Sequence, residues 1–496
     1  MKKIISALLA VLFCVIALAA CKTNDPAPKP GKQTTGGNEQ SQTTQLGDGL
    51  PEDLDFGGIT INIAIRDKYL DYYIGDKGGE LIWAAVYKAN QVVDERLNVK
   101  REWIKTTESS VDHADKVVTD ILSNDCTYDL VLVDQFYGCA KALEGAFANV
   151  KDEAYSKYLN FNKDYWYSDY MKNLTLSEDT LYFLGGDASP TIISWTSCTF
   201  FNWDLYDSYY GDPNALFRLV DNGGWTIDKL AQYSKEVYKD LDDSKTINEN
   251  DQVGFTVSTG QSAVFAAQCA GMTFSKRDGD GNMELDVVNS KNQSIFEKIY
   301  NLYNATEGVY AYDYRTISDD LANKMFADGK ALFMNEYFLR SWSEFTRNMN
   351  DAYAIIPRPK LDESQKDYIS VMQDPLMLYT IPISLDMSKA DAVSAFLEAQ
   401  GIENHKTVFP AIYDTALKIK FVSDKVDSEV ASHMVDLIYS SMTSDFAVIN
   451  GFYLNSIADT VGHLVERKEN TFVSSMQAIL EGAQQKLEEM KLNYRV

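Results

Sequence analysis

Early in the chain, hydrophobic residues repeat first every second position and then every three or four, and this alternation constrains the fold more than any other feature. The two-residue period covers 59–65 and 99–105, and residues 128–134 are almost continuously apolar. The helical period covers 80–97 and the segment after Ser110, a residue that can cap a helix. The order strand-helix-strand-helix-strand predicts right-handed crossovers and a parallel sheet.

The carboxyl ends of these strands give the first candidate site residues. In a parallel sheet, ligands bind beyond the carboxyl ends of the strands. The first strand is followed by Arg66 and Tyr69, and the third by Gln135 and Tyr137. We therefore expect these side chains at a ligand cleft. There Arg66 and Gln135 would form hydrogen bonds, and Tyr137 would stack on a ring.

Residues 180–203 are interpreted as a crossing between two packed units. Two apolar runs, 181–184 and 191–201, are predicted as strands, and the segment between them is rich in glycine and other turn formers. A polar turn between two packed units suits both a hinge and a ligand cleft, so Asp187 and Trp195 become candidates. The alternative is a β-hairpin inside one domain. Trp195 has its own alternative, which is a place in the core.

The N-terminus has the pattern of a lipoprotein signal peptide. Lys2 and Lys3 precede an apolar segment that is too short and too early for a membrane span. The segment ends in Leu-Ala-Ala-Cys, which resembles the bacterial lipobox. It predicts a signal peptide over 1–20, cleavage before Cys21 and acylation of the Cys21 thiol. The alternative is ordinary signal cleavage beside a chance cysteine. Residues 21–55 are predicted to form a flexible tether, because their composition is polar and rich in proline and glycine.

Length, charge and aromatic content narrow the functional classes. A chain of 496 residues suggests two or three domains. Its net charge of −26 makes nucleic acid and anionic membrane surfaces poor partners and disfavours anionic ligands. The chain also contains 30 Tyr, 23 Phe and 7 Trp, and such rings suit sugars or other flat ligands when they line a cleft. The alternative is that most tyrosines simply cover surface.

No cofactor is expected, and the cysteine pattern does not indicate zinc. We predict free, mostly buried thiols at Cys126, Cys139, Cys198 and Cys269.

Two loops are rich in the carboxylates that metal ions bind. The loop with Asp240, Asp242, Ser244 and Asp251 is a weak calcium candidate, because Lys245 stands where a calcium loop needs glycine. Residues 278–282 are interpreted as a hairpin turn that needs no metal.

The segment after position 222 predicts a helix start. Thr226 is a good N-cap for a helix over 229–239. Trp225 precedes it, and a structural role at the helix entry is favoured over ligand binding.

Seven segments, taken in order, resemble the family 1 extracellular solute-binding proteins, the group that contains maltose-binding protein. They read YDLVLVD, LYFLGGDAS, CTFFNWDLY, GGWTIDKL, ADGKALFMNEYFLR, YAIIPRPK and FPAIYDTALKIKF. The resemblance covers residues 56–456 and rests on order and spacing. It implies an α/β, two-lobed periplasmic-binding-protein-like fold (type II), with the ligand cleft between lobes joined by hinge crossings.

The resemblance also implies where the chain passes between the lobes. The first crossing would be 181–201, the second 328–335, and the third would follow a helix over 389–399. One lobe would combine 56–196 with 331–404, and the other 197–330 with 405–496.

The function implied is the extracellular solute-binding component of an ABC importer, which would capture a carbohydrate and deliver it to permease subunits. Lipidation would hold the protein on the outer face of a Gram-positive cell membrane. The full candidate ligand set is Arg66, Tyr69, Gln135, Tyr137, Asp187, Trp195, Glu336 and Tyr337. Of these candidates, the resemblance supports Tyr337 first, because it is an aromatic residue that follows the predicted second crossing.

Two other functional classes remain open. One is a surface glycan-binding lipoprotein or sensor without transport. The other is a carbohydrate-active hydrolase, although the sequence contains none of the common catalytic motifs and no catalytic residue is predicted.

Overall fold

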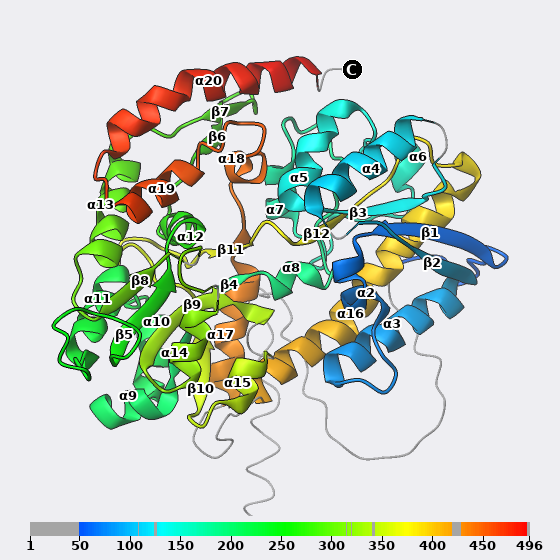
Figure 1. Cartoon of the computed structure of the whole chain (residues 1–496). Helices are drawn as coiled ribbons and strands as arrows, with labels where there is room; N and C mark the ends of the chain where they lie inside the picture. The colour runs from blue at the N-terminus through cyan, green and yellow to red at the C-terminus, as the bar shows by residue number, and fades with distance from the viewer. Residues whose placement is uncertain are drawn as a thin grey trace, which may run out of the picture. The chain divides into compact units, whose positions relative to one another are not determined.

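A four-stranded sheet forms the centre of the first lobe (Figure 1). Its strands, in spatial order, are β12 (Met377–Thr380), β3 (Leu130–Asp134), β1 (Ile59–Ile65) and β2 (Val99–Lys105). β1 pairs in parallel with both β2 and β3, whereas β12 is antiparallel to β3. The predicted parallel sheet is confirmed.

The computed structural model describes residues 49–107, 109–123, 126–313, 315–318, 320–339, 343–418 and 428–493.

The helices of this lobe follow the predicted periods. They include α3 (Leu81–Leu97), α4 (Ser110–Leu122) and the long α16 (Ala390–Lys418), which packs on α3. Ser109, one residue before the expected cap, accepts a hydrogen bond from the Asp112 N–H at 3.3 Å and begins α4. The signal segment 1–20, Cys21 and most of the tether lie outside the described residues. The body begins before the expected Phe56, because Leu50 is already buried.

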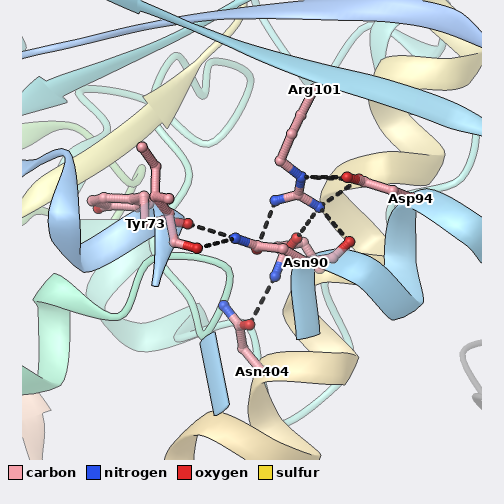
Figure 2. Close-up of polar contacts among 7 residues, drawn as sticks. Tyr73, Asn90, Asp94, Arg101 and Asn404 are labelled. Atoms are coloured by element: carbon pink, nitrogen blue, oxygen red, sulfur yellow. Dashed lines mark hydrogen bonds and ion pairs between the residues drawn. The ribbon is translucent and has the colours of Figure 1, made fainter. Parts of the chain in front are cut away.

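A hydrogen-bond network locks α3, β2 and α16 together (Figure 2). Arg101 of β2 donates to Asp94 and to the side-chain oxygen of Asn90, both on α3, and reaches Gln400 of α16 at 2.9 Å. Gln400 in turn donates to Asn404 at 2.7 Å. The network therefore fixes the two longest helices of the first lobe against its sheet.

The second lobe is built on a five-stranded sheet. Its spatial order is β10 (Tyr353–Ile356), β4 (Ser197–Asn202), β9 (Ala331–Tyr337), β5 (Val253–Ser258) and β8 (Val309–Tyr312). β5 is parallel to β8 and β9, whereas β4 runs antiparallel to β9 and β10. Residues 331–356, expected in the first lobe, therefore belong to the second. The prediction failed because β9 adds to β4 and β5 instead of returning to the first sheet.

Helices and one hairpin complete the second lobe. The helices are α9 (Trp203–Tyr210), α10 (Asn214–Asp221), α11 (Ile227–Val237), α12 (Gln261–Cys269), α13 (Ser290–Asn304), α14 (Leu321–Ala327), α15 (Glu344–Asn348), α19 (Asp459–Arg467) and α20 (Phe472–Asn493). As predicted, Thr226 caps α11 and Trp225 is a buried structural residue, whose indole donates to the Pro357 carbonyl at 2.9 Å. β6 (Ser275–Arg277) and β7 (Met283–Leu285) form the expected hairpin around 278–282.

The first crossing differs from its prediction. Residues 191–194 form the helical turn α8 (Thr191–Ser194), and only then does β4 begin. Pro190 precedes this turn with helical angles (φ −62°, ψ −19°), and the fixed φ of proline suits the start of a helix. The apolar character of 191–194 therefore reflects burial rather than a strand. Residues 181–184 also form no strand and contribute one isolated bridge, from Leu184 to Tyr379.

The other two crossings lie later in the chain than expected. The chain returns to the first sheet between β10 and β12, through β11 (Ser370–Val371), which pairs with β13 (Met442–Thr443). Helix α16 continues well past 399, and α17 (Ser428–Ser440) then packs against β10. The three crossing segments lie side by side, because Thr196 also bridges to Met372.

The remaining short elements are η2 (Asp67–Tyr69), α2 (Asp71–Ile74), α5 (Gln135–Ala140), η3 (Lys141–Glu144), α6 (Glu153–Ser156), α7 (Ser168–Leu174), η5 (Met387–Lys389) and α18 (Phe446–Ile449). Within the residues that the structure describes, no helix combines the length and apolar character needed to cross a membrane. The four predicted thiols are free, and all except the half-buried Cys126 are buried.

Candidate functional site

A cavity of about 300 Å³ opens at the carboxyl edges of both sheets. Its lining comes from the first lobe, from the second crossing and from the second lobe. The lining residues are Ser110, Asp134, Phe136, Tyr137, Gly260, Gln261, Val264, Arg315, Asp374, Pro375, Asp459, His463 and Glu466. This is the position where strand ends and helix starts of α/β sheets receive ligands, so we take the cavity as the candidate site and refer to it as the cleft.

Asp134 forms the polar part of the first-lobe wall. It ends β3 and caps α5, because its Oδ1 accepts the Tyr137 N–H at 3.0 Å. Its Oδ2 lies 4.0 Å from Nη1 of Arg66 and has no hydrogen bond within the described chain. Burial raises the pKa of Asp134 to about 6, against the opposing effects of the Tyr137 N–H and Arg66.

Asp374 lies in the second crossing and connects it to the second lobe. Its Oδ2 accepts a hydrogen bond from the side-chain amide of Gln261, the first residue of α12. Its Oδ1 is buried and has no hydrogen-bond partner among the residues described. Burial raises the pKa of Asp374 to about 7; the Gln261 hydrogen bond opposes this, and the charges of Asp459 and Asp134 add to it.

The second-lobe wall is built from a tight turn and one helix face. Gly260, with φ of +73°, turns the chain from β5 into α12 and so presents Gln261 to the cleft. Helix α19 carries Asp459, His463 and Glu466 at spacings of four and three, which place all three on one face. Burial raises the pKa of the Asp459 carboxyl above its usual range.

Arg315, which follows β8, brings the one guanidinium among the cleft-lining residues. It forms ion pairs with Glu466 and with Asp313, whose Oδ1 lies 3.1 Å from the arginine Nε. Its charge is therefore shared with carboxylates of its own lobe.

Three aromatic rings stand beside the cleft. Phe136 and Tyr137 of α5 line it, and their ring centroids are 5.0 Å apart. Phe452, which follows α18, reaches both rings, with centroids at 6.0 Å and 5.4 Å, and is 55% exposed. We call Phe136, Tyr137 and Phe452 the aromatic edge. Such a surface suits the C–H faces of sugar rings.

The residues predicted at the strand ends separate into lining and supporting side chains. Tyr137 lines the cleft. Arg66 and Tyr69 are buried behind Asp134, with the guanidinium 5.0 Å from the Tyr69 ring centre. Gln135 is fully buried and accepts a hydrogen bond from the Tyr170 hydroxyl at 2.5 Å. These three support the wall and are not among the residues that line the cavity.

Asp187 has a structural role instead of the predicted place in the cleft. Its carboxylate is fully buried and accepts hydrogen bonds from Tyr167, Tyr439 and His405, the last at 2.6 Å. Burial raises the pKa of Asp187, and Asp187 in turn raises the pKa of His405. The prediction failed because the loop of Asp187 turns toward α16 and α17, away from the strand ends.

Trp195, Glu336 and Tyr337 gather at the crossing rather than around the cavity. The rings of Trp195 and Tyr337 are 5.5 Å apart, and Tyr337 also packs near Phe265 of α12. Glu336 accepts a hydrogen bond from Asn323 at 3.3 Å. The three are not among the residues that line this cavity, and Trp195 is half-buried and packs against the core of buried residues.

Several cleft residues were missed by the sequence analysis. They are Gln261, Arg315, Asp374, Asp459, His463, Glu466 and the neighbouring Phe452. The spacing of Asp459, His463 and Glu466 on a helix was a usable signal. Nothing local marks Asp374, because its role depends on a crossing that brings it to a distant helix.

The weak calcium candidate has an explanation without metal. Carboxylate oxygens of Asp240, Asp242 and Asp251 lie within 4.8 Å of one another. Asp240 and Asp242 both accept the Ser244 N–H, and Asp251 accepts the backbone N–H of Leu241 at 3.0 Å. These hydrogen bonds account for the loop geometry.

Comparison with known proteins identifies the fold. No family model and no curated protein matches the chain. Solved structures similar to it include M. tuberculosis UspC (TM-score 0.55, 13% identity, covering 87% of this chain and 100% of that one). The maltose-binding periplasmic protein MalE of Listeria monocytogenes, in complex with maltose, has a TM-score of 0.55 and 14% identity, with coverage of 87% and 98%. A cyclo/maltodextrin-binding protein complexed with maltotetraose gives 0.55 and 12%, with coverage of 86% and 97%.

The chain therefore has the two-lobed periplasmic-binding-protein-like fold (type II) of sugar-binding ABC substrate-binding proteins, with its cleft between lobes joined by hinge crossings.

Proposed function

We propose that this chain is the extracellular solute-binding component of an ABC importer and captures an oligosaccharide between its two lobes. The observation that carries the proposal is the cleft, in which hydrogen-bonding side chains of both lobes stand beside an aromatic edge. Sugar hydroxyls need polar partners, and sugar C–H faces need rings. Two of the similar structures are named as complexes with maltose and maltotetraose.

A thermal-shift screen tests the ligand class. The protein without its signal segment is heated with mono- and oligosaccharides, with amino acids and peptides as controls. A ligand at a hundred times its dissociation constant adds about 2.7 kcal/mol to the free energy of unfolding. A shift with peptides alone would contradict the carbohydrate assignment and leave the fold untouched.

Capture between two lobes requires closure. Small-angle scattering should show a smaller radius of gyration when a saturating sugar is added. An unchanged radius with a bound sugar would contradict a two-lobe trap. Hydrolysis of a nitrophenyl glycoside panel would instead favour the hydrolase alternative, which the binding-protein names of similar structures do not support.

The location is proposed from the N-terminal sequence alone. Acylation of Cys21 would hold the protein on the outer face of the cell membrane, with 21–55 as tether. Cys21→Ala should release the protein from membranes. If the variant protein stays on membranes after a carbonate wash, the anchor lies elsewhere. If the variant is fully released and sugar uptake stays normal, anchoring is not needed for transport.

A further inference from the structure

The cleft contains more carboxylates than its cations neutralise. Asp134, Asp374, Asp459 and Glu466 line it, whereas Arg315 is the single lysine or arginine in the lining. Arg315 is already paired with Glu466 and Asp313. Asp134 has Arg66 behind it at 4.0 Å, whereas Asp374 and Asp459 form no ion pair with an arginine or lysine of the described residues. The cleft therefore has a net negative charge once these carboxyls are ionised.

Two of these carboxylates hold buried oxygens that lack a donor. Asp134 is only 1% exposed, and its Oδ2 forms no hydrogen bond within the described part of the chain. Asp374 is a half-buried residue, but its Oδ1 is buried and likewise has no hydrogen-bond partner among the described residues. A buried carboxylate oxygen without a donor destabilises the protein that contains it. A ligand that donates hydrogen bonds to both oxygens would remove this penalty.

The rings beside the cleft add a second attraction for the same kind of ligand. The faces of aromatic rings attract cations as well as sugar C–H groups. The aromatic edge of Phe136, Tyr137 and Phe452 includes two residues that line the cleft with the carboxylates. A ligand that combines a pyranose ring with a positive charge would use both surfaces.

We propose that the cleft selects an amino sugar, a saccharide whose ring carries a cationic ammonium group, and that Asp134 and Asp374 accept its hydrogen bonds. The inference rests on the proposed carbohydrate-binding function and narrows its ligand. Hydroxyl groups of a neutral sugar also donate to carboxylates, but they leave the net charge of the cleft uncompensated. An anionic sugar is repelled by it.

Three trisaccharides of matched size test the proposal by titration calorimetry. Chitotriose, here the unacetylated glucosamine trimer, carries an amino group on each sugar ring. N,N′,N″-triacetylchitotriose has the same rings without charge, and maltotriose is a neutral reference. At about pH 7, where the Asp134 carboxyl is mostly ionised, the Asp374 carboxyl is about half ionised and amines still carry protons, chitotriose should bind about tenfold tighter than the acetylated form. Raising sodium chloride from about 50 mM to about 500 mM should weaken chitotriose binding more than binding of the neutral sugars.

Variants assign the preference to the cleft carboxylates. Asp374→Asn keeps the side-chain shape and should remove most of the preference for chitotriose. Asp53→Asn, at an exposed position outside the cleft lining, changes the net charge equally and should leave the preference intact. Asp459→Asn serves as a second variant if Asp374→Asn fails to fold. A preference that survives in both cleft variants overturns the inference.

The outcomes separate the inference from the proposed function. If a neutral trisaccharide binds as tightly as chitotriose or more tightly, the amino-sugar inference is wrong and carbohydrate capture stands. If neither these sugars nor the wider saccharide panel binds, the proposed function fails and the inference fails with it.

Discussion

Gly462 of α19 packs directly against Gly260 at the start of α12. A Cβ added to Gly462 would lie 2.4 Å from the Gly260 carbonyl oxygen, so the two backbones are in contact. This contact fixes α19 beside the turn that presents Gln261. It therefore determines where Asp459 and Glu466 enter the cleft.

Gly462→Ala should separate α19 from α12. The added methyl group meets backbone rather than a flexible side chain, and such overpacking destabilises a protein by about 1–3 kcal/mol. Sugar affinity should fall as well, because the polar face of α19 moves. Urea unfolding and calorimetry measure the two effects. Gly482→Ala is the control, since its Cβ would meet only the Asn455 side chain, and a loss of equal size there would contradict the explanation.

The carboxyls of Asp134 and Asp374 should each lower the stability of the ligand-free protein as pH rises from about 4 to 7. Burial raises the pKa of Asp134 to about 6 and that of Asp374 to about 7, both from 3.8. A raised carboxyl pKa means that the folded state binds more protons than the unfolded state in this range, so ionisation above the unfolded pKa opposes folding.

The contribution of Asp374 can be isolated by substitution. Its carboxyl faces Gln261, Asp134 and Asp459, and Arg66 stands behind Asp134. The stability of Asp374→Asn relative to the parent should therefore rise between about pH 5 and 8, as measured by melting temperature. A stability difference for Asp374→Asn that stays flat over this range would show that burial does not raise the pKa of this carboxyl.

Phe452→Ala should weaken sugar binding without unfolding the protein. The side chain is 55% exposed, so its removal leaves no core cavity, yet it takes away one ring of the aromatic edge. We expect a loss of about 1 kcal/mol in binding free energy, a fewfold change in the dissociation constant measured by calorimetry. Ile383→Ala, also exposed but not a cleft-lining residue, is the control. Equal effects of the two would rule out a role for Phe452.

The strands and helices that were predicted correctly are those in which the period of the apolar residues shows which face is buried. Residues 59–65 and 99–105 became β1 and β2, and 80–97 became α3, because each buries one face against the same core. The strand predicted over 191–201 is correct for 197–201, which lie in β4, and wrong for 191–194, which form α8. Its residues are buried between the lobes, and burial without a regular period does not distinguish α8 from a strand.

The sequence predicted only those residues of the candidate site that lie just beyond the end of a strand. Tyr137 lies at the cleft because the chain beyond β3 faces the second lobe. Asp374 and the polar face of α19 could not be placed in the same way. They reach the cleft through crossings and through the Gly260–Gly462 contact, which join residues far apart in sequence.

Arg101→Lys tests how firmly the first lobe is held together. The Arg101 side chain is 8% exposed, and its guanidinium bonds Asp94, Asn90 and Gln400 at once (Figure 2). A lysine keeps the charge but has no planar fork, so it cannot serve all three partners. We expect a loss of about 2–3 kcal/mol in the free energy of unfolding, measured in urea. Arg218→Lys, in an exposed pair with Asp212, should cost less than about 0.5 kcal/mol. Equal losses in the two variants would mean that the network adds nothing beyond an ordinary surface ion pair.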